Sequence, residues 1–278
     1  MTLLRVLATA QVTISHTFYV DEVATDAAGP VTVSVKRLDG TVVATATAVH
    51  PGAPGVYTYA LPAQGAVDAL TIDWSGTVAG APITARDNVE VVGGYLFGLA
   101  EARALPPVLD PTRFPTGLLA STRTAVEQEC EKICGRAFVP RFRREKVRII
   151  NAAIMPTEID VRAIRKVTLR GVPYTSWYWP DRRGPLTNIA PAAVDDYDAV
   201  IEYEYGMDYP PEEIRQAAMM RLRTRLTATD NGIPSRALSF SVTDGGVYRL
   251  ATPGQKSTGV PEVDAAYQRY AVDVWGMS

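Results

Sequence analysis

The first third of the chain is dominated by short runs in which hydrophobic and polar residues alternate. Residues 32–49 hold two such runs joined by Asp39-Gly40, a dipeptide typical of two-residue hairpin turns. A further run occupies 55–62, and two or three more lie within 69–92. Alternation with a period of two is the pattern of β-strands that bury one face, so this region is predicted to be all-β.

Strands this short, separated by turn residues, are typical of a two-sheet sandwich. We therefore predict an immunoglobulin-like β-sandwich over residues 1–92. Trp74 is expected in its core, and Tyr57 or Tyr59 is expected to serve as a corner tyrosine. The region carries eight Asp/Glu and four Lys/Arg, so its surface is expected to be acidic.

Gly93-Gly94 ends the alternating pattern, and a Pro-rich connector follows at 106–115. Within 118–134 the apolar residues recur at helical spacing, and Gly135 is well placed to end that helix. The predicted helices span 95–105, 118–134, 212–228 and 262–272, and the predicted strands span 147–151, 157–170, 172–179 and 199–206, with a hairpin at 238–250.

These elements predict an α+β protein with two domains. The first is the sandwich of residues 1–92, and the second, residues 93–278, is a helical domain with a small β-sheet. Hydrophobic residues make up 47% of the chain and charged residues 21%, which is typical of a soluble globular protein. No apolar run approaches the roughly 20 residues that span a bilayer, so no membrane partner is expected. The N-terminus is interpreted as that of a mature protein.

The sequence contains no familiar catalytic motif. GxSxG, Walker A, GxGxxG and HExxH are all absent. His16 and His50 lie in the predicted sandwich and are interpreted as strand or surface histidines. Cys130 and Cys134 are poorly spaced for a disulfide and suggest core packing or a reducing compartment. We expect no enzyme activity and no cofactor.

An acidic run comprises Asp195, Asp196, Asp198, Glu202 and Glu204. Hard cations prefer clustered carboxylate oxygens, so this run is a candidate metal site. Glu202 and Glu204 alternate with apolar residues, however, which is the ordinary pattern of a strand with one solvated face. We therefore favour a solvated strand and expect no metal.

Two stretches are rich in arginine. Residues 136–148 hold six Arg/Lys and one Glu, and in the predicted helix 212–228 Arg221 and Arg225 are neighbours on one face. Two interpretations stay open. The favoured one is solvated or inter-subunit arginine, and the other is weak contact with passing DNA. The net charge of −2 argues against an autonomous nucleic-acid-binding protein.

Several short patterns follow one another after residue 95. In chain order they are CGRAF (134–138), VTLRG (167–171), YEYG (203–206) followed by PP (210–211) and an Ala-rich helix, SVTDGG (241–246) and GVPEVD (259–264). Taken in this order they resemble the head–tail connector (adaptor) family of long-tailed bacteriophages, and CGRAF is similar to that family's xGRxF helix exit. The sandwich departs from the simplest members and resembles the immunoglobulin-like appendages of phage structural proteins.

The resemblance implies a structural virion protein at the head–tail interface, or neck, assembled in the host cytoplasm. It implies a ring of identical copies, twelve when docked on the portal protein. The ring would join capsid to tail, extend the channel for DNA ejection, and present a platform for a stopper or tail-completion protein. The alternative is a carbohydrate-binding or adhesion module, but Tyr57, Tyr59 and Trp74 are few for an aromatic binding face.

Two groups of residues are expected at contacts under this resemblance. The candidates for transient, non-specific contact with genomic DNA in the channel are Arg221, Arg225, Arg141, Arg143 and Arg144. The candidates for portal contact are Tyr267, Tyr270, Val274 and Trp275. An apolar, aromatic segment is costly to leave in water and favours a partner surface. The alternative is that this segment packs on its own protomer.

Overall fold

The computed structural model describes residues 3–106, 108–179, 184–189, 199–227, 237–241, 247–250 and 257–272. The chain folds into two compact units. Unit 1 comprises Met1–Gly93 and Pro140–Tyr205, and unit 2 comprises Gly94–Val139 and Gly206–Ser278. Each unit is therefore built from two stretches that are far apart in the sequence.

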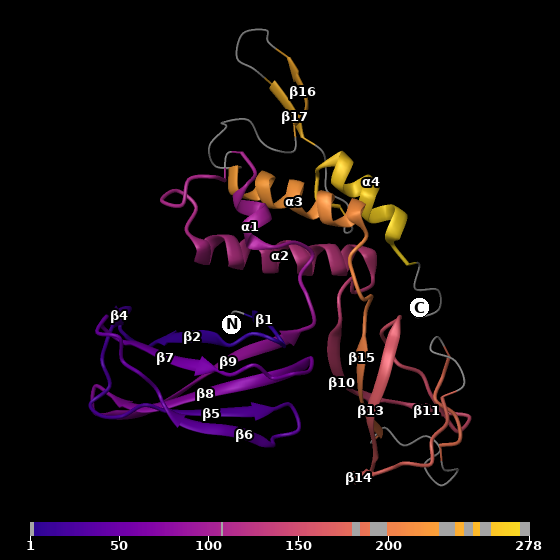
Figure 1. The fold of residues 1–278 in the computed structure, drawn as a ribbon, viewed down its shortest axis with the longest axis horizontal. Coiled ribbons are helices and arrows are strands. Elements are labelled where there is room, and N and C mark those ends of the chain that lie inside the picture. Colours follow the sequence, from indigo (N-terminus) through magenta and orange to yellow (C-terminus); the bar gives the residue numbers. More distant parts are fainter. Residues whose placement is uncertain are drawn as a thin grey trace. The chain divides into compact units, whose positions relative to one another are not determined.

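The N-terminal part of unit 1 contains a five-stranded sheet in the order β1-β9-β8-β5-β6 (Figure 1). Strand β1 runs parallel to β9, and the other neighbours are antiparallel. Two further antiparallel pairs are β2-β7 and β3-β4. The strands are β1 Leu3–Leu7, β2 Val12–Thr17, β3 Tyr19–Val20, β4 Val23–Ala24, β5 Thr32–Arg37, β6 Val42–Thr47, β7 Val56–Leu61, β8 Asp68–Val78 and β9 Ala81–Val92.

One hydrophobic core joins the β2-β7 pair to the five-stranded sheet. Trp74 and Ile72 of β8 are fully buried in it, together with Ile14 of β2 and Tyr57 of β7. The Tyr57 hydroxyl accepts a hydrogen bond from the Ala27 backbone N–H at 2.8 Å. The predicted core position of Trp74 is confirmed, while the immunoglobulin-like topology of this two-layered region stays a prediction.

The second part of unit 1 is a four-stranded antiparallel sheet in the order β10-β15-β13-β14, with a separate β11-β12 pair. The strands are β10 Arg141–Val147, β11 Ile149–Ile150, β12 Ala153–Ile154, β13 Val161–Leu169, β14 Val172–Pro173 and β15 Ala199–Tyr205. In the central strand β15, Ile201 and Tyr203 are fully buried, whereas Glu202 and Glu204 on the other face are half-buried. The predicted alternation of this strand is confirmed.

The sequence patterns do not predict β10. The prediction begins a strand at residue 147, but β10 already begins at Arg141. Arginine, lysine and glutamate are weak strand formers on their own. Here Arg144 is opposite Glu202 of β15 and donates to it, and a cross-strand pair of this kind stabilises the strand. Strand β14 is also far shorter than the predicted strand 172–179.

The described residues of unit 2 form four helices and an antiparallel pair, β16-β17 (Figure 1). The elements are α1 Leu99–Arg103, α2 Thr116–Cys134, α3 Glu212–Thr227, β16 Ala237–Ser241, β17 Val247–Leu250 and α4 Pro261–Tyr270. Their shared core is formed by the apolar stripes of α2, α3 and α4, which include Leu119, Val126, Ala218, Leu222 and Tyr267. All four predicted helices are present, and the hairpin predicted at 238–250 matches β16-β17.

Local capping explains where two of these helices begin and end. Helix α1 is shorter than the predicted 95–105, because the Glu101 carboxylate accepts the Gly98 backbone N–H and starts the helix at Leu99. Helix α2 ends where Gly135 adopts a left-handed conformation with φ of 67°. The predicted end of the α2 helix is thereby confirmed.

The compact units do not coincide with the predicted domains 1–92 and 93–278. Residues 140–205 pack with the N-terminal strands, since β10 contacts β8 and β9 and the Gly93 N–H donates to the Pro140 carbonyl at 2.9 Å. The α+β class is confirmed. The division into domains 1–92 and 93–278 stays a prediction.

Candidate functional site

The arginines predicted on the second long helix form an ion cluster between α2 and α3. The Arg221 guanidinium donates to both carboxylate oxygens of Glu129, Nε to Oε2 at 2.7 Å and Nη2 to Oε1 at 2.9 Å. Arg225, one turn further along α3, lies with Nη2 3.2 Å from Glu129 Oε1. A bidentate arginine–carboxylate pair is among the stronger polar contacts in proteins.

This cluster is largely enclosed. The Arg221 and Glu129 side chains are only 10% and 20% exposed. Burial alone would raise the pKa of Glu129, but the hydrogen bond and charge of Arg221, with the charge of Arg225, outweigh it and hold that pKa below its usual value. Arg221 therefore serves to join two helices of its own unit. Arg225, with 34% of its side chain exposed, is the member of the cluster that faces solvent more.

The three candidate arginines of β10 lie in different surroundings. The Arg141 side chain is 0% exposed, with Nε 3.7 Å from Glu90, a carboxylate that also accepts Arg5 Nε at 2.7 Å. In this protomer Arg141 is thus not a surface residue and is not available to DNA. Arg143 pairs with Glu145 at 2.9 Å and with Glu158.

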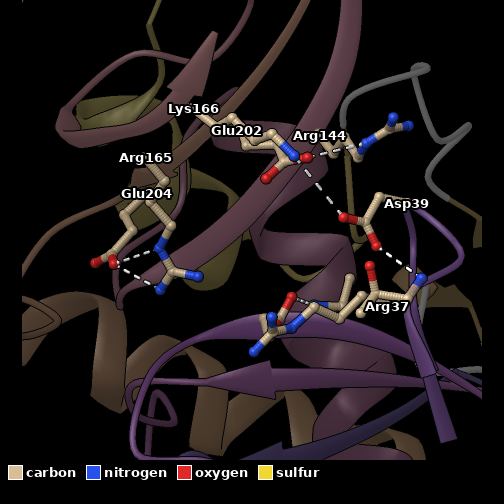
Figure 2. A network of polar contacts seen from close by, with 10 residues as sticks. Arg37, Asp39, Arg144, Arg165, Lys166, Glu202 and Glu204 are labelled. Atoms are coloured by element: carbon tan, nitrogen blue, oxygen red, sulfur yellow. Dashed lines mark hydrogen bonds and ion pairs between the residues drawn. The ribbon is translucent and has the colours of Figure 1, made fainter. Parts of the chain in front are cut away.

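Arg144 belongs to a row of charges across one face of the sheet. Its Nε donates to Glu202 on β15 at 3.1 Å, and Lys166 on β13 is opposite Glu202 in the strand register. Glu204 lies two residues after Glu202 on β15. It accepts two hydrogen bonds from Arg165 of β13, at 2.6 and 2.8 Å. Figure 2 shows these side chains together on the sheet. Glu202 and Glu204 share one face of β15, as the alternation predicts. The face is less solvated than expected, because the two side chains are only 16% and 27% exposed and each accepts from an arginine.

The structure offers no grouping of side chains that would hold a metal ion within the described residues. Glu202 and Glu204 of the acidic run are each engaged by an arginine, as above. The remaining members, Asp195, Asp196 and Asp198, lie outside the described residues. The absence of a metal stays an expectation.

The C-terminal aromatic segment divides into three parts. Tyr267 of α4 is 0% exposed in the core of unit 2, where its carbonyl accepts from the Cys134 thiol at 3.4 Å. Tyr270 is half-buried and packs edge-on against Phe138, with ring centroids 6.1 Å apart. Val274 and Trp275 lie outside the described residues. For Tyr267, therefore, packing on its own protomer replaces the expected surface role, because α4 is needed to close the helical core.

The cysteines and histidines form no arrangement suited to nucleophilic catalysis within the described residues. Cys130 and Cys134 are both free and buried, with Sγ atoms 4.0 Å apart, and burial raises the pKa of the Cys130 thiol. His16 is 3.0 Å from Asp87, whose carboxylate also accepts the Trp74 indole N–H. These contacts give the histidine a structural partner in the sandwich.

The aromatic residues considered for a carbohydrate-binding face do not form one. Trp74 is fully buried and Tyr57 is almost so, and Tyr59 packs against the same core. Their rings pack in or against the core that joins the β2-β7 pair to the five-stranded sheet, as expected of core aromatics.

Sequence reasoning missed a second polar contact on α2. The Glu127 side chain, 0% exposed, accepts the Leu96 backbone N–H at 2.9 Å, and the buried Arg123 stacks over the Tyr95 ring at 3.3 Å. Both α2 residues lie on the stripe that carries Leu119, Val126 and Cys130. An i,i+4 pair of charges on an otherwise apolar stripe was the available signal.

Three of the patterns that carry the family resemblance lie wholly or partly in unit 2, namely CGRAF, the end of YEYG with the PP that follows it, and GVPEVD. VTLRG belongs to unit 1, and all of SVTDGG except Ser241 lies outside the described residues. The Met207 N–H donates to the Ala137 carbonyl at 3.2 Å, so the chain after YEYG lies beside the exit of the CGRAF helix. Gly206 has φ of 97°, and a Cβ there would clash with the Val139 carbonyl oxygen. In the last pattern, the Asp264 carboxylate accepts the Thr258 backbone N–H and hydroxyl at 2.7 Å each. These residues therefore shape the backbone around the helical core.

The chain is similar to solved structures of particle necks over about two thirds of its length. No protein-family model and no curated protein sequence matches the chain. Among solved structures, a chain in the neck of a native GTA particle computed with C12 symmetry is 16% identical, with a TM-score of 0.39, over 67% of this chain and 98% of that one. A chain in the neck of an empty GTA particle computed with C6 symmetry is 15% identical, with a TM-score of 0.37, over 66% and 93%. Similarities this weak carry no argument about function.

Membrane insertion through a helix finds no support in the described part of the chain, where no helix combines the length and the apolar character that crossing requires.

Proposed function

We propose that this chain is a structural protein of a tailed-phage neck, the adaptor ring that docks on the portal and joins the capsid to the tail. The observation that carries the proposal is the ordered set of patterns from CGRAF to GVPEVD, which resembles the head–tail connector family. Three of its parts, CGRAF, the end of YEYG and GVPEVD, lie in one helical unit, where Gly135, Gly206 and Asp264 each fix the backbone.

The proposed ring contains twelve copies when docked. In a cyclic ring each interface is heterologous, so one surface of a protomer meets a different surface of its neighbour. The partners are the portal protein on one side and a stopper or tail-completion protein on the other. The role needs no catalysis, and we propose that the chain is not an enzyme.

The proposed ring continues the DNA channel, and its wall must let DNA slide. Affinity for DNA rises with each phosphate that a basic residue neutralises, so sparse arginines next to carboxylates suit such a wall. Arg225, Arg143 and Arg144 fit this description, since each retains exposure while pairing with a glutamate. Val274 and Trp275 are the proposed portal contacts, together with the half-buried Tyr270.

The test is assembly on purified portal rings. The chain is mixed with portal and the complex is isolated by size exclusion, with portal alone as the control. Negative-stain side views are expected to show one additional ring layer at a single end of the portal. A chain that elutes apart from the portal at micromolar concentration, or that adds no layer, would contradict the proposal.

A further inference from the structure

The two parts of unit 1 carry opposite charge. The N-terminal residues 3–93 hold eight Asp/Glu and four Lys/Arg. The described strands and loops of 141–205 hold nine Lys/Arg and five Asp/Glu. An acidic region and a basic region thus lie within one compact unit, and opposite fields of this kind attract each other.

The contact between them includes the tip of the β5-β6 hairpin. Asp39 Oδ2 lies 4.0 Å from Lys166 Nζ, and Figure 2 shows Asp39 approaching the row formed by Arg144, Glu202 and Lys166. Hydrogen bonds from Thr41, first from its backbone N–H, and then the charges of Lys166 and Arg144 keep the pKa of Asp39 below its usual value. Asp39 is therefore an anion at neutral pH.

The surface that Asp39 approaches has the character of a weak phosphate site. We define the basic face as Arg144, Lys146 and Lys166, which lie on one side of the β10-β15-β13 sheet. Arg144 and Lys166 are 32% and 43% exposed, and Lys146 is exposed. Glu202 neutralises this face only in part, and Asp39 supplies one further negative charge.

We propose that Asp39 is an intramolecular competitor that occupies the basic face and weakens its binding to the phosphate backbone of DNA. This inference rests on the proposed function, because only a neck protein would meet the genomic DNA. It assigns a role to the acidic N-terminal region. A carboxylate held near the basic side chains competes with each passing phosphate. The protomer is thereby kept from adhering to the genome before and after assembly.

The physical argument predicts a measurable size. Removing the Asp39 charge lets the basic face make about one more phosphate contact. One contact steepens the dependence of log affinity on log salt by about 0.9, which corresponds to at most about eightfold tighter binding at 0.1 M salt. A gain of about three- to eightfold is therefore expected.

The experiment measures binding of the full chain to a fluorescently labelled 20-base-pair duplex by anisotropy, at several salt concentrations. The test variant is Asp39→Asn. Its side-chain oxygen can still accept the Thr41 N–H, and Asn-Gly is as good a hairpin turn as Asp-Gly. The matched control is Asp21→Asn, which makes the same change in net charge. Asp21 has φ of 48°, a conformation that asparagine accepts, in the turn between β3 and β4.

Tighter binding and a steeper salt dependence are expected for Asp39→Asn but not for Asp21→Asn. Adding Lys166→Gln to Asp39→Asn should return the affinity to the wild-type value or below it. Equal effects of the two asparagine variants would show that only net charge matters and would overturn the inference. So would the lack of any binding by Asp39→Asn at the lowest salt. Assembly on portal rings is measured in a separate experiment. The DNA-binding result can therefore contradict the role of Asp39 without contradicting the proposed neck function.

Discussion

The α2-α3 contact and the β10-β15-β13 face both pair arginine with glutamate, but in different surroundings. Arg221 and Glu129 make two short hydrogen bonds and are mostly enclosed, whereas Arg144 makes one bond of 3.1 Å to Glu202 and keeps a third of its side chain exposed. The two carboxylates are similarly enclosed, at 20% for Glu129 and 16% for Glu202, so the difference lies in the arginine and in the number of hydrogen bonds. Enclosed bidentate pairs hold a fold together, while a pair with a more exposed arginine and a single bond adds less stability. The helical contact is thus architectural, and the strand face is the better candidate for transient contacts.

The largest effect on stability is expected at Gly206, where two backbone segments of the helical unit come very close together. Gly206→Ala should destabilise the protein by about 3 kcal/mol or more, because it combines a strained φ with a clash against the Val139 carbonyl. Thermal unfolding of the purified variant measures this. The control is Gly171→Ala, where φ is also positive at 79° but nothing lies near the new Cβ, and about 1 kcal/mol is expected. Equal losses at both sites would show that the close approach at Gly206 contributes nothing.

The next effect tests the two ion pairs directly. Glu129→Gln should cost about 2 kcal/mol, because it removes charge-assisted bonds from a mostly buried Arg221. Glu202→Gln should cost less, about 1 kcal/mol, because Arg144 makes a single hydrogen bond to it and keeps 32% of its side chain exposed, although the Glu202 side chain is only 16% exposed. Urea unfolding of both variants at pH 7 gives the comparison. A larger loss of unfolding free energy for Glu202→Gln than for Glu129→Gln would contradict the view that the α2-α3 contact is the more important of the two for stability.

The enclosed pair should also respond to acid. Since the pKa of Glu129 in the folded protein lies below the ordinary 4.5, its contribution to stability is fully present above pH 4.5. That contribution is lost as the pH falls through the lowered value. The difference in unfolding free energy between wild type and Glu129→Gln should therefore be constant from pH 7 to about pH 5 and shrink below that. A difference that grows in acid would contradict the lowered pKa.

The smallest effect on stability is expected at the chain end. A variant that stops after Val272 keeps all of α4, including Tyr267, and should unfold within about 0.5 kcal/mol of wild type. It lacks Val274 and Trp275, so its co-purification with portal should fall sharply. Unchanged portal binding by this variant would remove the C-terminal segment from the proposed interface.

Helices were the part of the fold most accessible from the sequence. The apolar spacing within 118–134 and the glycine at 135 give α2 to within two residues, since both signals act locally. Strand β10 was missed because its stabilising partners, Glu202 among them, lie about sixty residues away in the sequence. Cross-strand charge pairs become visible only when the sheet is assembled.

For the candidate site, too, the sequence showed local features but not those set by distant segments. Arg221 and Arg144 were singled out by residue type, but their burial could not be read from the sequence. Arg141, which is fully enclosed near Glu90, and Tyr267, which completes the helical core, each have their surroundings set by distant segments. An arginine-rich run and an aromatic stripe look the same on a surface and in an interior.

The most direct test of the central claim is a cryo-EM map of the neck of virions that contain this chain, at a resolution that distinguishes side chains. The account predicts a closed ring of twelve copies at the junction of portal and tail, with the charged strand face or Arg225 lining the channel. Finding the chain at the tail tip, on the capsid surface or outside any closed ring would contradict it.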